Sequence, residues 1–204
     1  MDHFRHHQAD QPRESISSLH ETSRQASSLL SSDDLYLFNE GTHFHLYDKL
    51  GAHPTSFGGV EGTYFAVWAP EAEQVSVFGT FNHWDPTRHP LRPCQSSGIW
   101  EGFVPGVGRG TLYKFHIRSR NHGAVLIKTD PFARLNEVPP KSASIVWDLN
   151  YTWHDHDWMQ SRARHNALNA PISIYEVHLG SWMRVPGDGN RSLSYREAAP
   201  KLID

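Results

Sequence analysis

The stretch Thr111-Leu-Tyr-Lys-Phe-His-Ile-Arg118 alternates between two sets of side chains and is typical of a β-strand. Successive side chains of a strand point to opposite faces of its sheet. One face carries Thr111, Tyr113, Phe115 and Ile117, and the other carries Leu112, Lys114, His116 and Arg118. The pattern predicts a strand with one buried face and one wetter face.

Similar short runs rich in β-branched and aromatic residues flank this stretch on both sides. They predict strands near 62–69, 74–79, 98–104, 124–129 and 143–147, separated by Gly, Pro and Asn. Many short strands punctuated in this way favour a mainly β fold, an antiparallel immunoglobulin-like β-sandwich over 59–150. The glycine-rich segment 106–110 lies between two of these strands and opens no helix, so we expect a hairpin loop there.

A different sequence pattern begins at residue 171, where Pro-Ile-Ser-Ile-Tyr-Glu-Val-His-Leu-Gly-Ser-Trp extends to residue 182. This nearly continuous apolar run is typical of a strand buried on both faces of a parallel sheet. A helical pattern follows over 193–203. We therefore expect 171–204 to be the start of an incomplete α/β domain, loosely ordered or docked on the sandwich.

The remaining segments are polar or short. Residues 1–32 predict a disordered tail, with transient helix at most over 21–30, in which His3, His6 and His7 are solvated. Residues 33–58 form an approach segment, where Asp33 or Asp34 is expected to cap a short helix or turn. Residues 151–170 predict a linker.

Composition limits the classes of partner. A formal charge of -3 gives no reason to expect nucleic acid or an anionic membrane as a partner. The single cysteine, Cys94, excludes an intramolecular disulfide and is compatible with a reducing compartment. No apolar run is long enough for a membrane span and the first residues lack a signal-peptide pattern, so we expect a cytoplasmic protein.

Few ionisable groups have the spacing of a reactive site. The run 154–157, His-Asp-His-Asp, lacks a second ligand pair, and a hydrated linker is the favoured interpretation. Glu176 and His178 lie within the apolar strand of 171–182, where a structural role is favoured over acid–base chemistry. No phosphate loop or dinucleotide fingerprint is evident. We expect no metal, no cofactor and no catalytic residue in this chain.

A tryptophan in the turn that follows 74–79 is the candidate for ligand binding. The turn is Gly79-Thr-Phe-Asn-His-Trp-Asp-Pro86, and Asn and Asp-Pro favour a tight bend there. The flat apolar ring of Trp84 suits the C–H face of a sugar, with Asn82 and Lys114 as hydrogen-bonding partners. The alternative is that Trp84 plugs one end of the sandwich or packs on a neighbouring domain. Trp68 and Trp100 are expected in the core.

Several motifs resemble a known family. The sandwich motifs are similar to those of a carbohydrate-binding module of family 48: Phe65-Ala-Val-Trp-Ala-Pro70, Val75-Ser-Val-Phe-Gly79, Phe81-Asn-His-Trp84, Gly98-Ile-Trp100, Tyr113-Lys-Phe115 and Lys128-Thr-Asp-Pro131. Residues 170–182 and 193–197 resemble the beginning of the catalytic barrel of the 1,4-alpha-glucan (glycogen) branching enzymes. Residues 34–53 resemble the approach segment of the same enzymes. The resemblance covers 34–204.

The resemblance implies a fold and an activity. Branching enzymes belong to glycoside hydrolase family 13, with a (β/α)8 barrel, and 171–204 would be the first strand and part of a helix of that barrel. The family cleaves an α-1,4 link of a glucan and transfers the freed segment to a 6-hydroxyl. Its carboxyl groups follow later strands, so we expect this chain alone to be inactive. Trp84 and Lys114 match the family's glucan-binding positions, whereas 118–123 lacks the second aromatic residue expected there. The alternatives are a free-standing glucan-binding or scaffolding module, or the corresponding part of a debranching or trehalose-forming relative.

Overall fold

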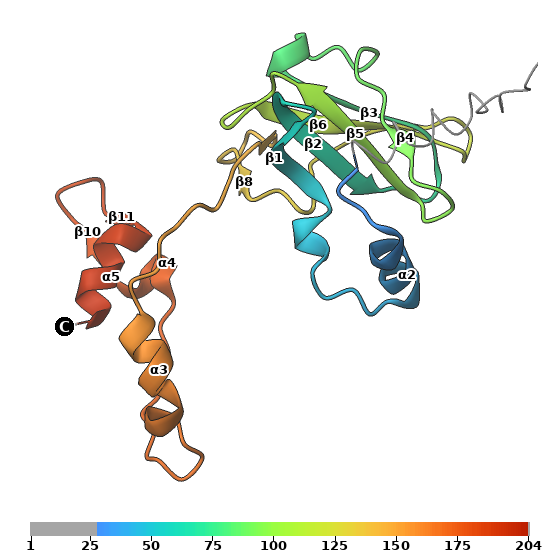
Figure 1. The fold of residues 1–204 in the computed structure, drawn as a ribbon. Helices are drawn as coiled ribbons and strands as arrows, with labels where there is room; N and C mark the ends of the chain where they lie inside the picture. Colours follow the sequence, from blue (N-terminus) through green and yellow to red (C-terminus); the bar gives the residue numbers. More distant parts are fainter. Residues whose placement is uncertain (1–27, 204) are drawn as a thin grey trace, which may run out of the picture. The chain divides into compact units, whose positions relative to one another are not determined.

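The computed structural model describes residues 28–203 of the 204-residue chain. Contacts between residues divide the chain into two compact units, and the boundary along the sequence lies between Asn150 and Tyr151 (Figure 1). In the described part of the chain, no helix is both long enough and apolar enough to cross a membrane.

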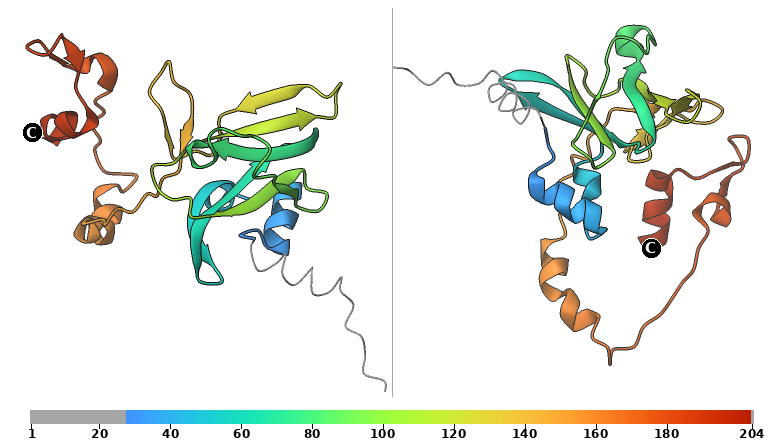
Figure 2. Two further views of the ribbon diagram at one scale, coloured as in Figure 1. Left: turned by 90° about the horizontal axis from the view of Figure 1, so that it is seen from above. Right: turned by 90° about the vertical axis from the view of Figure 1, so that its right-hand side faces the viewer.

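The first unit contains two antiparallel sheets (Figure 2). The first sheet has the order β1 (Gly51–Phe57), β2 (Val60–Trp68), β5 (Ile99–Pro105) and β4 (Arg92–Pro93). The second has the order β3 (Ala72–Gly79), β6 (Leu112–Ser119), β9 (Ser144–Ile145) and β8 (Leu135–Asn136), and β7 (Val125–Lys128) also pairs with β6. The predicted mainly β antiparallel fold is confirmed.

The alternation of 111–118 decides how β6 is buried. Tyr113 and Phe115 have no exposed surface, and Ile117 packs against the same core. They join side chains of the neighbouring strand β3 and, across the sandwich, side chains of the first sheet. This one cluster includes Phe65, Val67, Val75, Val77, Trp100 and Val104. Burial of apolar surface of this extent is the main favourable contribution to folding. The other face of β6 is more exposed, as predicted.

Residues 28–50 cover part of the outer face of the first sheet. This segment contains α2 (Ser32–Glu40) and the 3-10 turn η1 (Leu46–Asp48). A second cluster joins its apolar side chains to β2 and β5: Leu30, Leu35 and Leu50 with Tyr64, Ala66 and Ile99. The prediction of a disordered tail is therefore wrong for 28–32, because Leu30 is buried there. The rest of that prediction, with His3, His6 and His7, lies outside the described residues.

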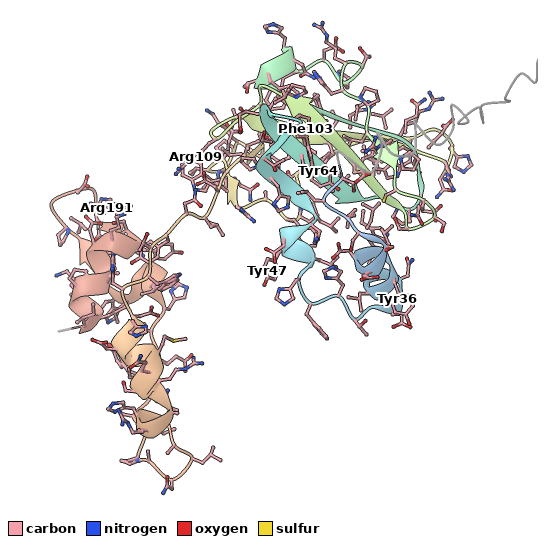
Figure 3. The ribbon with its side chains drawn as sticks, in the orientation of Figure 1. Tyr36, Tyr47, Tyr64, Phe103, Arg109 and Arg191 are labelled. Atoms are coloured by element: carbon pink, nitrogen blue, oxygen red, sulfur yellow. The ribbon has the colours of Figure 1, made fainter. Side chains whose placement is uncertain are left out.

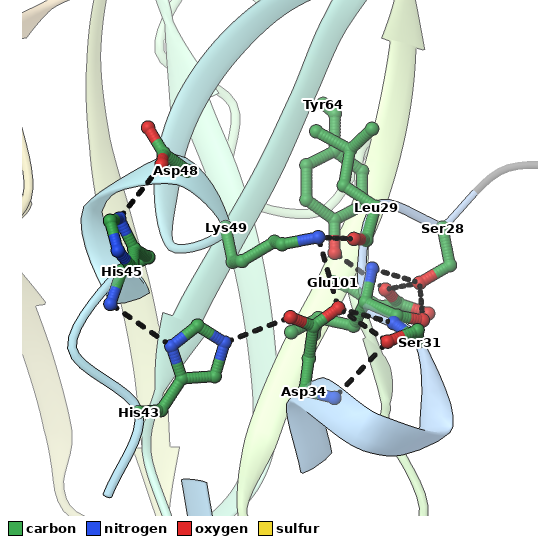
Figure 4. A network of polar contacts seen from close by, with 11 residues as sticks. Ser28, Leu29, Ser31, Asp34, His43, His45, Asp48, Lys49, Tyr64 and Glu101 are labelled. Atoms are coloured by element: carbon green, nitrogen blue, oxygen red, sulfur yellow. Dashed lines mark hydrogen bonds and ion pairs between the residues drawn. The ribbon is translucent and has the colours of Figure 1, made fainter. Parts of the chain in front are cut away.

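Helix α2 begins with a capping box made by Ser31 and Asp34 (Figure 4). The Ser31 hydroxyl accepts a hydrogen bond from the Asp34 N–H, and the Asp34 carboxylate accepts one from the Ser31 N–H. The expected cap at Asp33 or Asp34 is thus wrong by two or three positions, since Asp34 is the third residue inside the helix. His43 Nε2 and Lys49 Nζ also reach the Asp34 carboxylate, at 2.8 and 2.9 Å, and tie the following segment to the helix.

Three further details differ from the sequence-based expectation. Strands β1, β4 and β8 were not predicted, and β1 contains Pro54 at the sheet edge, where a missing N–H is tolerated. Residues 106–110 connect β5 to β6, which lie in different sheets, so this loop is not a hairpin. Trp68 is 56 % exposed rather than in the core, because Phe65 and Val67 occupy the inward positions of β2.

The second unit contains α3 (His156–His165), α4 (Leu179–Trp182), β10 (Arg184–Val185), β11 (Arg191–Ser192) and α5 (Tyr195–Ile203). The helix predicted over 193–203 is confirmed, and α3 lies in the predicted linker. The strand predicted within 171–182 is wrong: residues 171–178 have no regular structure, and Ile172 and Ile174 are exposed. A strand must pair its backbone groups with a neighbour, and the described residues offer this segment none.

Candidate functional site

The turn from 79 to 86 presents Trp84 on the first unit. It begins with the 3-10 turn η2 (Thr80–Asn82), and the next two residues, His83 and Trp84, both adopt positive φ, 58° and 60°. Residues other than glycine are uncommon at positive φ, so the loop must be held in this conformation by its surroundings. The Trp84 N–H donates to the Gly79 carbonyl at 2.8 Å, which closes the loop onto the end of β3.

Asn82 provides the internal support of this loop. Its side chain is buried, its Oδ1 accepts from the Gly79 N–H at 2.9 Å, and its Nδ2 donates to the Asp85 carbonyl at 3.0 Å. The same Nδ2 lies 3.0 Å from His89 Nδ1. The polar atoms of Asn82 are thus directed into the loop, which places this residue beneath the candidate surface rather than on it.

Asp85 stabilises the second half of the loop. Its carboxylate accepts hydrogen bonds from the Thr87 hydroxyl at 2.7 Å and from the Thr87 N–H at 2.9 Å. These bonds, the hydroxyl contribution being the larger, hold the pKa of Asp85 below its ordinary value. The carboxylate form is therefore the one that the turn favours.

The Trp84 ring packs against one aromatic neighbour and stays partly exposed to solvent. It packs edge-on against Phe78, with ring centroids 5.5 Å apart. Trp84 is 39 % exposed, whereas the core residue Trp100 is 8 % exposed. A ring that plugged the sandwich would be buried like Trp100. Trp84 is instead held by an aromatic neighbour and remains accessible.

Lys114 and His116 lie beside the same phenylalanine on the outer face of the second sheet. Lys114 is the antiparallel partner of Phe78, and its Nζ donates to the Ser142 hydroxyl at 2.9 Å. The His116 ring packs edge-on against Phe78, with centroids 6.3 Å apart. Of the three predicted site residues, Trp84 packs on Phe78 and Lys114 lies beside Phe78 on the neighbouring strand, with its amine bonded to Ser142.

Strand β7 continues this outer face with aliphatic side chains. His116 pairs with Ile127, and Arg118 pairs with Val125, so both aliphatic residues share the face of Lys114. Each is 57 % exposed. Sequence reasoning noted the missing aromatic residue in 118–123 and overlooked this aliphatic surface. The signal that could have found it is the predicted strand over 124–129, because alternate side chains of a strand, here 125 and 127, share one face.

The other candidates from the sequence do not form a site. Glu176 and His178 are exposed rather than enclosed in a sheet, and His178 Nδ1 contacts the Ser181 hydroxyl at 2.7 Å. In the run 154–157, His156 Nε2 lies 2.8 Å from the amide nitrogen of Gln160 on α3. Across 28–203, no group of three or more His, Cys, Asp or Glu side chains is placed to hold a metal ion.

The face formed by Trp84, Phe78 and Lys114, here called the Trp84 face, carries groups that can contact a polyol. An exposed indole offers a flat apolar platform, and the lysine amine, serine hydroxyl and imidazole around it can donate or accept hydrogen bonds. Residues 49–133, which include most of these groups, match the family model of carbohydrate-binding module 48, the isoamylase N-terminal domain. The first unit therefore carries a module of this family.

Sequence comparison defines the relationship further. The chain is 55% identical over 178 residues to the 1,4-alpha-glucan branching enzyme GlgB of Gloeobacter violaceus, covering 86% of this chain and 24% of that protein. It is 52% identical over 176 residues to the GlgB of Aquifex aeolicus, covering 86% and 28%. The chain is thus related to the 1,4-alpha-glucan branching enzymes, as its motifs indicated, and spans about a quarter of the length of these relatives.

Solved structures show weaker similarity. The ligand-free PulA of Klebsiella pneumoniae has a TM-score of 0.42 and 26% identity, covering 51% of this chain and 10% of that one. A putative alpha amylase of Salmonella typhimurium has a TM-score of 0.48 and 24% identity, covering 66% and 20%.

Proposed function

We propose that the face formed by Trp84, Phe78 and Lys114 binds an α-1,4-glucan, and that this chain is the N-terminal glucan-binding part of a cytoplasmic 1,4-alpha-glucan branching enzyme. The observation that carries the proposal is the exposed indole of Trp84 on a loop that is fixed from below by Asn82. Such a platform is rigid before the ligand arrives, so little entropy is lost on binding.

The neighbours of Trp84 fit a glucan better than an aromatic or a charged ligand. A glucose unit has an apolar C–H face that stacks on the indole and hydroxyls that bond to the Lys114 amine and the Ser142 hydroxyl beside it. The aliphatic residues Val125 and Ile127 extend the apolar surface on the same side of the sheet. Without a second aromatic ring in 118–123, we expect weak binding to a short oligosaccharide.

The activity that we propose belongs to the complete enzyme. A segment of glucan is cleaved at an α-1,4 link and transferred to a 6-hydroxyl, by the two-carboxylate retaining chemistry of glycoside hydrolases. In this proposal the module holds the polymer and contributes no reacting group, and no cofactor is needed. Asn82 contributes indirectly, by holding the loop of Trp84.

Co-sedimentation with glycogen tests the binding proposal. The chain and its Trp84→Ala variant are compared with Trp68→Ala, which removes an exposed indole of the first sheet that is not part of the proposed face. We expect Trp84→Ala to lose at least nine-tenths of the retention and Trp68→Ala to keep it. Equal retention by all three proteins, or none by the wild type, would eliminate the role of this face.

A separate measurement tests the absence of catalysis in the 204-residue chain. Incubation with amylose, followed by enzymatic debranching and chromatography of the released chains, reports new α-1,6 links. We expect none, because the family's carboxyl groups follow later barrel strands. Branch formation by this chain alone would refute that part of the proposal.

A further inference from the structure

The structure assigns to His89 the role of a positioning residue: its neutral imidazole accepts a hydrogen bond from Asn82 and thereby holds the Trp84 loop, so that glucan binding weakens when His89 is protonated. This inference rests on the proposed function of the Trp84 face. It concerns the regulation of that face by pH and adds no contact between His89 and the sugar.

The hydrogen bonds of Asn82 determine which form of His89 fits. The amide oxygen of Asn82 is identified by the Gly79 N–H that donates to it, and the amide nitrogen by the Asp85 carbonyl that accepts from it. The atom that faces His89 Nδ1 at 3.0 Å is therefore an N–H donor. Nδ1 must then be an acceptor, so its ring is neutral with the proton on Nε2.

Protonation would put a second N–H group opposite the first. The Asn82 amide cannot rotate to accept from it without giving up both of its other bonds, to Gly79 and Asp85. Those bonds hold a loop in which two successive residues, His83 and Trp84, have positive φ. Such a conformation persists only where its surroundings over-determine it. Loss of the hydrogen bond between Asn82 and His89, here called the histidine clip, therefore releases the indole of Trp84 from its fixed position.

The surroundings of His89 favour the neutral ring. Its ring packs on Phe81 with centroids 5.1 Å apart, and its carbonyl accepts from the Val77 N–H of β3 at 3.0 Å. Burial lowers the pKa of His89 first, and the adjacent Arg88 adds to this, while Asp85 acts in the opposite direction. The residues of β5 that line the hollow beside His89, 102–104, add no ionisable group.

The sign of the pH effect follows from these contacts. Because the folded loop lowers the pKa of His89, the loop is most stable when the ring is neutral, above the ordinary histidine pKa of about 6.5. Stability of the loop is lost as the pH falls below that value. Binding through Trp84 is thus expected to be full at pH 7.5 and weakened at pH 5.

The test compares wild type, His89→Asn and His89→Leu at pH 7.5 and pH 5, with maltoheptaose as the probe in isothermal titration calorimetry. An asparagine can place an amide oxygen near the position of Nδ1 and accept at every pH, whereas leucine cannot accept. We expect wild-type affinity to fall at least fivefold at pH 5, His89→Asn to change less than twofold, and His89→Leu to be weak at both values. His83→Asn, at a neighbouring exposed histidine, should keep the wild-type profile.

A second readout needs neither sugar nor variant. Hydrogen exchange of the Trp84 amide, which donates to Gly79, reports whether the loop is closed, and it should accelerate at least tenfold between pH 7.5 and pH 5 after correction for the intrinsic rate. The nitrogen shifts of His89 should show the Nε2–H tautomer at pH 7.5. An Nδ1–H tautomer, or an exchange rate that does not respond to pH, would overturn the inference.

The two proposals can fail separately. If Trp84→Ala binds maltoheptaose as well as wild type while the exchange of the Trp84 amide responds to pH, the glucan face is wrong and the histidine clip stands. If Trp84→Ala abolishes binding and His89→Asn keeps the same pH profile as wild type, the clip is wrong and the glucan face stands.

Discussion

The indole of Trp84 meets the phenyl ring of Phe78 edge-on, with centroids 5.5 Å apart and planes at 84°. Phe78 is only 6 % exposed, yet it lies on the outer side of β3, beneath Trp84 and beside His116. A buried aromatic residue on the outer face of a sheet requires something to cover it, and here Trp84 contributes to that cover. The relationship explains why an exposed tryptophan can occupy a fixed position.

Removal of the ring under Trp84 should therefore weaken binding without unfolding the module. We expect Phe78→Leu to lose an edge-to-face contact worth about 0.5–1.5 kcal/mol. Affinity for maltoheptaose should then fall by roughly twofold to tenfold, measured by isothermal titration calorimetry. The matched control is Phe57→Leu, which breaks an edge-on pair with Phe103, with centroids 5.0 Å apart, on the first sheet. Equal losses of affinity in both variants would contradict the role of Phe78.

The Asp34 carboxylate of α2, the helix that also carries Tyr36 (Figure 3), should contribute stability that depends on pH (Figure 4). Burial raises its pKa, but hydrogen bonds from Ser31, Lys49 and His43 together outweigh that effect and hold the pKa well below its ordinary value. A group with a lowered folded pKa stabilises the protein above its unfolded pKa, about 4, and loses that contribution as the pH falls further. We expect Asp34→Asn to reduce the free energy of unfolding by about 1–3 kcal/mol at pH 7.

Urea unfolding at pH 7 and at pH 3 measures this difference. The difference in the free energy of unfolding between wild type and Asp34→Asn should become smaller at pH 3. At that pH the wild-type carboxylate accepts a proton in the unfolded chain. Asp33→Asn changes an exposed carboxylate of the same helical turn and controls for the general effect of charge. A gap that stays constant between the two pH values would show that the Asp34 charge is not what stabilises the helix.

The extended segment before α4 should be the site of proteolysis. Residues 171–178 have no regular structure, and their large apolar side chains Ile172, Ile174 and Tyr175 are 71 to 83 % exposed. Proteases cut exposed backbone that lacks hydrogen-bonded structure. Brief digestion with chymotrypsin should cut first within 172–179 and leave a fragment that contains the first unit. Mass spectrometry identifies the cut, and uniform resistance through residue 203 would contradict the exposure of this segment.

Strands whose burial follows the alternation of their own side chains could be predicted from the sequence. The alternation in 111–118 predicted β6 and its buried face, since Tyr113 and Phe115 enter the core. Strand β1 was missed because Gly51 and Pro54 weaken its strand signal, and the sheet accepts it as an edge. The strand predicted within 171–182 needs partners that the described residues do not supply.

The candidate site was predictable only in part. The turn composition pointed to Trp84, and β6 placed Lys114 on the wetter face, but the register that sets Lys114 opposite Phe78 comes from pairing with β3. The contact between Asn82 and His89 crosses the loop, and no spacing rule indicates it. Trp68 was expected in the core because it lies within a predicted strand. The structure resolves that ambiguity by covering only part of the outer face with residues 28–50.

The most direct measurement follows the tryptophan indoles while glucan is added. In a nitrogen–proton correlation spectrum of the chain, titration with maltoheptaose should shift the indole signal of Trp84 and leave those of Trp68 and Trp100 unchanged, since the first is exposed on the other sheet and the second is buried. Trp84→Ala should remove the shifted signal and the binding together. Shifts confined to other indoles, or no shift at millimolar maltoheptaose, would contradict a glucan face at Trp84.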